Sequence, residues 1–434
     1  MQGSSWLRYL ALFTGAVVAI WLLLCGSGRA AEPQSMKASA PESQSARLLE
    51  DVPDARIEAG LLTIAPGAIY WQRFGHNAVV LRDRADPARL VAVNYGIFDF
   101  GERNFLLNFL LGRMHYFAIA GDPRAELDDY AASGRGIGVQ WLALTPRQVA
   151  LLRARLQRDT SPARARYRYD YYTRNCSTRV RDALDVAFGG ALERSATSRS
   201  RGWTYRQHSL RLARPDLPLA LGIHLGLGGY TDRPLTLWQE AFVPQRLADA
   251  VADLRIDGQP AVARTELLSQ HRIGLPNAQP PAWRWVFALT GGALAAALWA
   301  LHRASQRVAQ NIFGWLRGAL LALCGLVGVG LLALWFGTDH IAAHRNLNIL
   351  VLSPLCLPWL VASRSRRAAL RRFGQLAVAG VLLSLAIALW FAFTDALQQD
   401  FADWLLLFAP ALLVLARAER VEHKSPPAAP PAPA

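Results

Sequence analysis

The chain is poor in cysteine, with four among its 434 residues. Cys25, Cys324 and Cys356 fall inside apolar segments, which leaves Cys176 alone in a long intervening region that we expect to be exported. Exported domains normally use cysteines in pairs, because oxidising compartments favour disulfides. A single cysteine cannot staple such a domain, so Cys176 is either a small buried apolar residue or a reactive thiol.

The chain also lacks the features that would explain its formal charge of +15 by nucleic-acid binding. Such binding surfaces usually come from clustered Lys and Arg. Here much of the arginine flanks apolar segments, the rest is scattered, and no basic block carries interleaved aromatic residues. The exported region holds no Cys/His cluster with the spacing of zinc ligands. We therefore expect no nucleic-acid partner, no metal and no other cofactor.

Both ends of the chain have their own composition. Residues 1–31 contain an apolar run with Arg8 near its start, which predicts a cleaved signal peptide or a retained transmembrane anchor. Residues 32–46 are rich in Ser, Pro and Glu and are typical of a linker. Residues 418–434 end in a Pro/Ala-rich stretch and predict a disordered cytoplasmic tail.

Five further apolar runs predict an all-α transmembrane domain over residues 283–417. Most of them reach the ~17–25 residues that a helix needs to cross the hydrocarbon core. Buried helices of a soluble domain are the alternative, but five such runs edged by Trp and Arg argue against it. The runs lie at about 285–301, 318–336, 347–362, 374–393 and 402–416.

The charges of the connecting loops predict the orientation. Arginine is concentrated in 302–317 and 363–373 and recurs after the last run. In contrast, 338–346 holds one arginine, and the charged residues of 394–403 are all acidic. Basic loops stay on the cytoplasmic side. The large region 32–282, which includes the exported domain 47–282, is therefore predicted to lie outside the cytoplasm, as is the loop at 337–346.

The exported region has a mixed α+β pattern. Short apolar or alternating runs at 76–82, 90–95, 114–120 and 137–144 predict strands. Thr145-Pro146 is typical of a helix start, with Thr as the N-cap and Pro in the first turn. A second helix follows Cys176, with apolar residues at helical spacing and Gly189-Gly190 at its end.

Cys176 is thus expected at the N-terminus of a helix. Unpaired backbone N–H groups and the positive end of the helix dipole stabilise a thiolate there. Arg174 and Arg179 add positive charge nearby in sequence. The polar neighbours Asn175 and Ser177 argue against full apolar burial of the thiol.

A nucleophilic thiol needs a base, and His76 is the preferred candidate. Gly75 precedes it and a predicted strand follows it. Glycine lets a ligand or a neighbouring backbone come close. The other candidate histidines are His115, His208 and His224.

Several motifs together resemble the Lnb family, which is named for its N-terminal periplasmic domain. The first are Phe74-Gly75-His76, residues 94–100, Tyr116-Phe117 and the stretch from Tyr169 to Thr178. Residues 232–244 and the loop around Asp339-His340 are also similar. The resemblance covers about 47–250 firmly and the spans to about 415 more loosely.

The resemblance implies a fold and an activity. The fold would be a circularly permuted, papain-like (NlpC/P60-like) cysteine-enzyme fold, in which His precedes Cys. The activity would be that of a membrane-bound lipoprotein N-acyltransferase. It would move an acyl chain from a phospholipid, through a Cys176 thioester, to the α-amine of a lipoprotein's N-terminal cysteine. The catalytic domain would lie in the periplasm, at the bacterial inner membrane.

The resemblance also implies roles for individual residues. Cys176 matches the nucleophile and His76 the general base. Asn94 is the first choice for a third polar residue, and Asp99 is the alternative. Substrate contacts are expected from two regions of the chain, namely Asn175, Tyr95 and Tyr171 in the exported domain and His340 and Arg345 in an outer membrane loop.

Two other functions remain open at this point. One is a cell-wall amidase or peptidase of the same fold, which leaves five C-terminal spans unexplained. The other is a non-enzymatic membrane sensor or assembly factor, in which Cys176 is a core residue.

The loop charges lead to a prediction of topology. A reporter fused after Ala282 should behave as exported, and one fused at Ser363 should behave as cytoplasmic, because basic loops are retained. Alkaline phosphatase and green fluorescent protein fusions measure the two sides. The reverse pattern would place the Cys176 domain in the cytoplasm and overturn the assignment.

Overall fold

The computed structural model describes residues 50–99, 101–363, 365, 367–394 and 397–424. Within them the chain forms two compact units, each described by itself below. The α+β unit comprises residues up to 223 together with 233–280, and the helical unit comprises 224–232 and the residues from 281 onward. The predicted leader, the linker at 32–46 and residues 425–434 lie outside the described part of the chain. The prediction of a disordered tail from residue 418 is wrong for residues 418–424, which belong to a helix that ends at Lys424.

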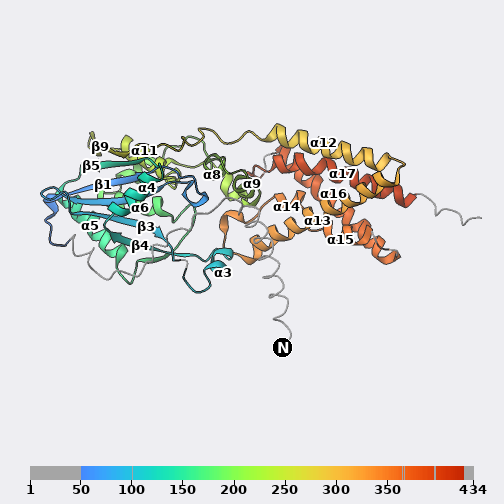
Figure 1. The fold of residues 1–434 in the computed structure, drawn as a ribbon, viewed down its shortest axis with the longest axis horizontal. Coiled ribbons are helices and arrows are strands. Elements are labelled where there is room, and N and C mark those ends of the chain that lie inside the picture. The colour runs from blue at the N-terminus through green and yellow to red at the C-terminus, as the bar shows by residue number, and fades with distance from the viewer. Residues whose placement is uncertain (1–49, 100, 364, 366, 395–396, 425–434) are drawn as a thin grey trace, which may run out of the picture. The chain divides into compact units, whose positions relative to one another are not determined.

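A seven-stranded antiparallel sheet forms the centre of the α+β unit (Figure 1). Its strand order is β6-β4-β3-β2-β1-β5-β9, and β7 and β8 form a separate small hairpin. The strands are β1 (Ile57–Ile64), β2 (His76–Asp83), β3 (Leu90–Ile97), β4 (His115–Gly121), β5 (Ile137–Leu142), β6 (Arg166–Arg168), β7 (Arg255–Ile256), β8 (Gln259–Pro260) and β9 (Val262–Ser269).

All four strands predicted from sequence are present, as β2, β3, β4 and β5. Strand β1 was not predicted from the sequence, although it lies between β2 and β5 in the sheet. Six of its eight residues are buried, so apolar and polar residues do not alternate along it. A strand that is buried on both faces shows no alternation of apolar and polar residues from which it could be predicted.

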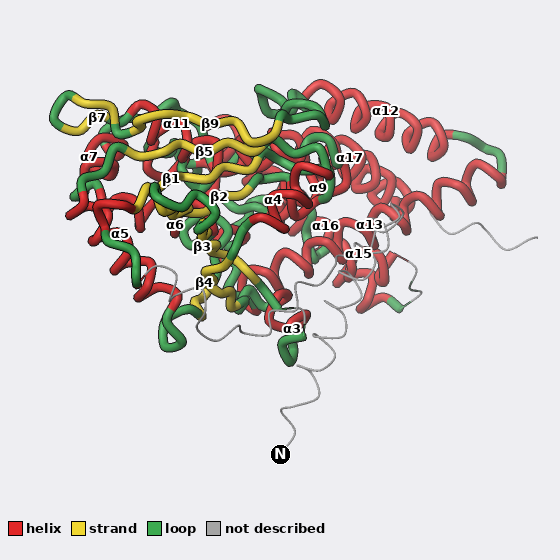
Figure 2. The backbone as a smooth tube through the Cα atoms, turned by 60° about the vertical axis from the view of Figure 1, so that its left-hand side comes forward, coloured by secondary structure: helices red, strands yellow, loops and turns green. Residues whose placement is uncertain are grey.

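Helices cover both faces of the sheet (Figure 2). One face carries α5 (Pro146–Thr160), α6 (Cys176–Ala187) and α11 (Pro244–Asp253) on a core that includes Val79, Leu81, Val93 and Tyr95. The other face carries α4 (Arg124–Ala132) on a smaller core that includes Ala78, Val80 and Ala92. Neighbouring residues of one strand therefore serve different cores.

The two predicted helices begin where their caps require. Thr145 caps α5 in a reciprocal capping box with Gln148, and Asn175 caps α6 in the same way with Thr178. Such caps satisfy first-turn N–H groups that have no partner inside the helix. Residues 189 and 190 are glycines with positive φ, and they end α6 as predicted.

Short helices complete the α+β unit around this frame. They are η1 (Asp54–Arg56), η2 (Tyr70–Gln72), α3 (Phe105–Leu110), α7 (Ala191–Thr197), α8 (Tyr205–Ala213) and α10 (Leu237–Glu240). Helix α9 (Leu217–Gly226) leads out of this unit, because its last residues belong to the helical unit.

The described part of the helical unit has helices at all five predicted apolar runs. Among the described residues, α12 (Arg284–Arg303), α13 (Arg307–Gly337) and α16 (Ala368–Thr394) are long and apolar enough to cross a membrane. The fifth predicted run is a helix, α17 (Ala402–Lys424), but it is not among those three.

The third predicted span is broken into α14 (Asn348–Val351) and α15 (Cys356–Ser363). Leu352, which follows α14, already has non-helical dihedral angles. Pro354 comes two residues later, and a proline disfavours helical backbone in the residue before it. Hydrophobicity alone therefore overestimated the length of this helix.

The predicted exported domain, 47–282, is interrupted by residues 224–232, which belong to the helical unit. The carbonyl oxygen of Leu225 accepts hydrogen bonds from Asn346 Nδ2 at 2.8 Å and from Asn348 Nδ2 at 2.9 Å. These contacts join segments that are far apart in the sequence, so the chain pattern offers no sign of them.

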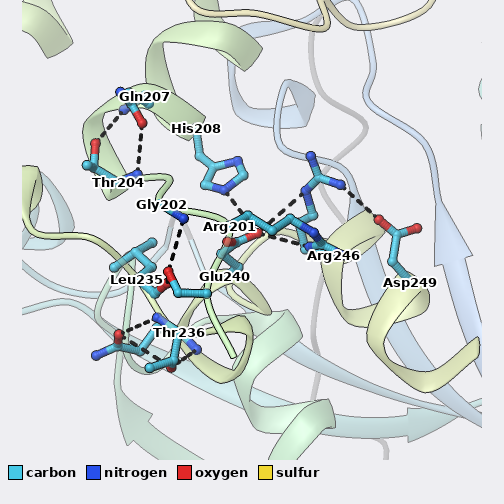
Figure 3. Close-up of polar contacts among 12 residues, drawn as sticks. Arg201, Gly202, Thr204, Gln207, His208, Leu235, Thr236, Glu240, Arg246 and Asp249 are labelled. Atoms are coloured by element: carbon cyan, nitrogen blue, oxygen red, sulfur yellow. Dashed lines mark hydrogen bonds and ion pairs between the residues drawn. The ribbon is translucent and has the colours of Figure 1, made fainter. Parts of the chain in front are cut away.

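A buried charged cluster lies between α8, α10 and α11 in the α+β unit (Figure 3). Glu240 is fully buried and accepts a hydrogen bond from Arg201 at 3.1 Å. Arg246 Nε lies 3.9 Å and His208 Nε2 lies 3.6 Å from the same carboxylate oxygen. Burial lowers the pKa of His208, so the arginines supply the positive charge at neutral pH.

This cluster anchors the segment that follows Glu240 against the start of α6. Asn175 Nδ2 donates to the carbonyl oxygen of Phe242 at 2.8 Å. Ser177 Oγ donates to the carbonyl oxygen of Ala241 at 2.6 Å. The position of the α6 N-terminus thus depends on a segment more than sixty residues further along the chain.

Removing Glu240 should destabilise the α+β unit. Glu240→Ala leaves Arg201 and Arg246 beside an empty buried site, and breaking such a pair typically costs about 3–5 kcal/mol in free energy of unfolding. Asp249→Ala removes a partly exposed partner of Arg246 and should cost less than about 1 kcal/mol. Denaturant unfolding of the full chain in detergent compares the two variants. Equal losses would contradict the structural role of Glu240.

Candidate active site

Three polar side chains meet where β2 begins and β3 ends. His76 is the first residue of β2, Asn94 lies on β3, and Cys176 is the first residue of α6. The register pairs Ala78 with Asn94, so His76 and Asn94 are diagonal neighbours on one face of the sheet. His76 Nε2 lies 2.9 Å from Asn94 Oδ1.

Two glycines make this arrangement possible. Gly75 has a φ of +81°, and a Cβ there would lie 2.7 Å from the carbonyl oxygen of Ile64. Gly96 has a φ of +87°, and a Cβ there would lie 3.4 Å from Cys176 Cβ. The expected close backbone approach before His76 is therefore present, and a second one brings β3 against the start of α6.

The Cys176 thiol has a polar environment. The His76 ring and the backbone N–H groups of Asn77 and Ser177 interact with it electrostatically. Because Asn94 occupies Nε2, the other ring nitrogen, Nδ1, is left for the thiol. Cys176 is half-buried. It is therefore not the fully buried apolar residue of the non-enzymatic alternative.

The electrostatics of the pair favour a thiolate and an imidazolium. Burial raises the pKa of Cys176, but the charge of His76 and the hydrogen bonds from His76, Asn77 and Ser177 outweigh it and lower the pKa below that of an ordinary thiol. Burial likewise opposes protonation of His76, but the charge of Cys176 prevails and raises the pKa of His76 to about 9. The direction for Cys176 agrees with the sequence prediction.

The source of the positive charge differs from that prediction. Arg174 is exposed. Arg179 points toward Asp159, with its Nη2 3.5 Å from Asp159 Oδ2, and lies over the ring of Tyr167. The imidazolium and the backbone N–H groups stabilise the thiolate, because residues adjacent in sequence point in different directions from a helix start.

Two of the residues predicted to contact substrate are buried and already hydrogen-bonded within the protein. Tyr95 is fully buried on the opposite face of the sheet, where its hydroxyl donates to Asp159 Oδ2 at 2.9 Å. Asn175 is buried as the N-cap of α6, and its amide is used by Thr178, Phe242 and Tyr171. Their proximity to the site in sequence reflects core packing and helix capping.

The remaining predicted residues of the α+β unit differ in position. Tyr171 is 39 % exposed, and its ring meets the edge of Tyr169, which stacks on Tyr116. Asp99 is exposed and accepts a hydrogen bond from the N–H of Gly101 at 2.7 Å. The side chain beside His76 is therefore that of Asn94, and Asp99 is occupied in a local turn.

His340 and Arg345 belong to the helical unit, in a loop around η4 (Ile341–Ala343). His344 Nε2 lies 2.9 Å from the carbonyl oxygen of Thr338 and folds the loop back on itself. The Arg345 side chain is exposed. A substrate contact by these two residues stays a prediction.

One residue of the site had no sequence signal. Glu126 lies on α4, and its Oε2 accepts a hydrogen bond from Asn94 Nδ2 at 3.1 Å. It is one acidic residue among several on a helix surface, so spacing does not single it out. Within the described ranges, no three His, Cys, Asp or Glu side chains converge as metal ligands.

Comparison with known families identifies two matching regions of the chain. Residues 45–209 match the Lnb N-terminal periplasmic domain. Residues 286–420 match the Lnb transmembrane domain. No curated protein and no solved structure matches the chain. The two family matches indicate a membrane protein with a periplasmic portion. They follow one another along most of the sequence, and the chain belongs to the Lnb family.

Proposed function

We propose that this protein is a lipoprotein N-acyltransferase of the bacterial inner membrane that uses Cys176 as its nucleophile. Lnb family membership supports a membrane lipoprotein-modifying role. The observation that carries the finer proposal is the contact of the Cys176 thiol with His76, whose other ring nitrogen lies 2.9 Å from Asn94 Oδ1. This order of nucleophile, base and orienting amide is that of thiol acyl-transfer enzymes.

In the first half-reaction the Cys176 thiolate attacks the ester carbonyl of a phospholipid. A sulfur–carbon bond forms, and the carbonyl electron pair moves onto oxygen. Thr178 N–H is taken by the Asn175 cap and Ser177 N–H faces the thiol. The N–H of Cys176 itself, at the first position of α6, has no acceptor within the helix and is suited to stabilise this oxyanion. Collapse expels the lysophospholipid alkoxide, which takes the proton of the His76 imidazolium. A Cys176 thioester and a neutral His76 remain.

In the second half-reaction the α-amine of the lipoprotein's N-terminal cysteine attacks the thioester carbon. Neutral His76 accepts the proton that the amine loses. The carbon–sulfur bond breaks, an amide is formed, and Cys176 leaves as a thiolate beside the imidazolium. The starting ion pair is thus regenerated, and no proton is gained or lost over the cycle.

Other features support lipid substrates. Three helices of the helical unit are long and apolar enough to cross a bilayer. In the α+β unit, the exposed ring of Tyr171 ends a chain of aromatic contacts through Tyr169 to Tyr116 that suits an acyl chain. In the helical unit, the guanidinium of Arg345 would suit a lipid phosphate, with His340 as a further polar group.

A cell-wall amidase or peptidase would use the same thiol and the same permuted papain-like fold. It would act on a soluble peptide and would have no use for apolar spans. Incubation with cell-wall peptides separates the two activities, because only the amidase would cleave them.

Replacement of the proposed nucleophile should abolish N-acylation. In proteoliposomes holding the full chain and a diacylated lipoprotein, Cys176→Ala should give no N-acyl product. His76→Ala should lower the rate by about 10²–10⁴-fold, because general base catalysis is lost. Mass spectrometry of the N-terminal lipopeptide measures the product. Cys324→Ala, which alters a cysteine buried in α13, should retain activity. An active Cys176→Ala variant would refute the mechanism.

The ion pair should be visible in the pH dependence of thiol alkylation. Reaction of Cys176 with iodoacetamide should already be fast at neutral pH, because its pKa is lowered. In His76→Ala the rate should rise only toward the ordinary thiol pKa of ~8.5. Peptide mapping by mass spectrometry resolves Cys176 from the other cysteines. If the pH profiles of alkylation in the wild-type protein and in His76→Ala were the same, His76 would not be the cation that stabilises the thiolate.

A further inference from the structure

The Glu126 carboxylate is held on both of its oxygens. Oε2 accepts from Asn94 Nδ2 at 3.1 Å, and Oε1 accepts from the Tyr130 hydroxyl at 2.5 Å. Tyr130 is one turn further along α4, and its ring lies 4.5 Å from the guanidinium carbon of Arg135. The carboxylate therefore has a defined place, although it is only half-buried.

This contact decides which way the Asn94 amide faces. A carboxylate can only accept hydrogen bonds, so the NH₂ group of Asn94 must face Glu126. The amide oxygen then faces His76 Nε2, 2.9 Å away. Amide orientation is otherwise open to a flip of oxygen and nitrogen, and a carboxylate partner removes that freedom.

The amide orientation in turn decides the tautomer of neutral His76. Asn94 Oδ1 can only accept, so Nε2 carries the hydrogen. Nδ1 then presents its lone pair toward Cys176, which is the state needed to accept a proton. A flipped amide would offer a donor to Nε2 and favour hydrogen on Nδ1, where it would block proton transfer.

We propose that Glu126 is a positioning residue of this site, which acts through Asn94 to hold His76 in the reactive tautomer. This inference rests on the proposed roles of Cys176 and His76. Glu126 touches neither the thiol nor the substrate in the proposed reaction. Its charge also contributes to the raised pKa of His76, after the larger effects of burial and of Cys176.

Glu126→Gln tests the proposal, because it keeps the size of the side chain but allows either amide orientation at Asn94. The rate of N-acylation should fall about tenfold to hundredfold, as for other partners that orient a functional histidine. The pH profile of Cys176 alkylation should shift toward higher pH. Asp129→Asn makes the same charge change at an exposed position of α4 and should leave both measurements unchanged.

A double-mutant cycle distinguishes positioning from general damage. If Glu126 acts through Asn94, then Glu126→Gln should have little further effect in an Asn94→Ala background. The proposal would be overturned if the effects of Glu126→Gln and Asn94→Ala on the alkylation profile were additive. A wild-type profile in Glu126→Gln would also overturn it. Should Glu126→Gln not fold, Tyr130→Phe releases Oε1 and should shift the profile in the same direction. A wild-type profile in Tyr130→Phe would equally overturn it.

The alkylation readout also separates this inference from the proposed function. The chain could lack N-acyltransferase activity while its alkylation profile still shifts in Glu126→Gln. That result would support the positioning role of Glu126 and contradict the proposed acyl acceptor. The chain could instead be an active N-acyltransferase whose alkylation profile does not shift in Glu126→Gln. That result would support the proposed function and contradict the positioning role of Glu126.

Discussion

The Cys176 thiol reaches the His76 ring because α6 begins directly beside Gly96 of β3, where a side chain would crowd the cysteine. This approach depends on the positive φ of Gly96 and on an irregularity in the pairing of β3 with β4 at the same point. It also depends on the segment after Glu240, whose carbonyl oxygens receive the side chains of Asn175 and Ser177. The position of Cys176 therefore depends on the backbone of β3 and on the hydrogen bonds of Asn175 and Ser177.

Once the thiol and the imidazole are in contact, electrostatics decide their protonation. Burial by itself would keep both groups neutral. The mutual attraction of the charged forms and the backbone N–H groups of Asn77 and Ser177 reverse this preference. The attraction between two opposite charges is stronger in a half-buried site than in water.

The helical unit has a different organisation, in which polar contacts hold irregular segments among apolar helices. The amides of Asn346 and Asn348 converge on the carbonyl oxygen of Leu225, and Gln399 Nε2 donates to Asn346 Oδ1 at 2.9 Å. A buried ion pair of Arg317 with Glu419 lies beside Trp359 Nε1. Non-helical backbone in such a region must satisfy its polar groups within the protein, and these side chains do so.

Local patterns in the sequence determined much of the fold. The period-2 runs predicted β2 to β5, and the caps at Thr145 and Asn175 belong to helices that begin as expected. The motifs also identified the family, because Cys176, His76 and their neighbours are read directly from the chain. Strand β1 and the broken third span were missed, since burial on both faces and a helix break are not visible in hydrophobicity alone.

Tertiary structure alone decided which side chains share the site. Tyr95 and Asn94 are neighbours in sequence, yet strand alternation sends one into the core and the other to His76. Asn175 precedes Cys176 but caps its helix. Glu126 comes from a helix that lies between Asn94 and Cys176 in the sequence, and only its hydrogen bond to Asn94 reveals it. Sequence determines the local conformation and the available chemistry. The direction in which each side chain points depends on the register and packing of segments that are distant along the chain.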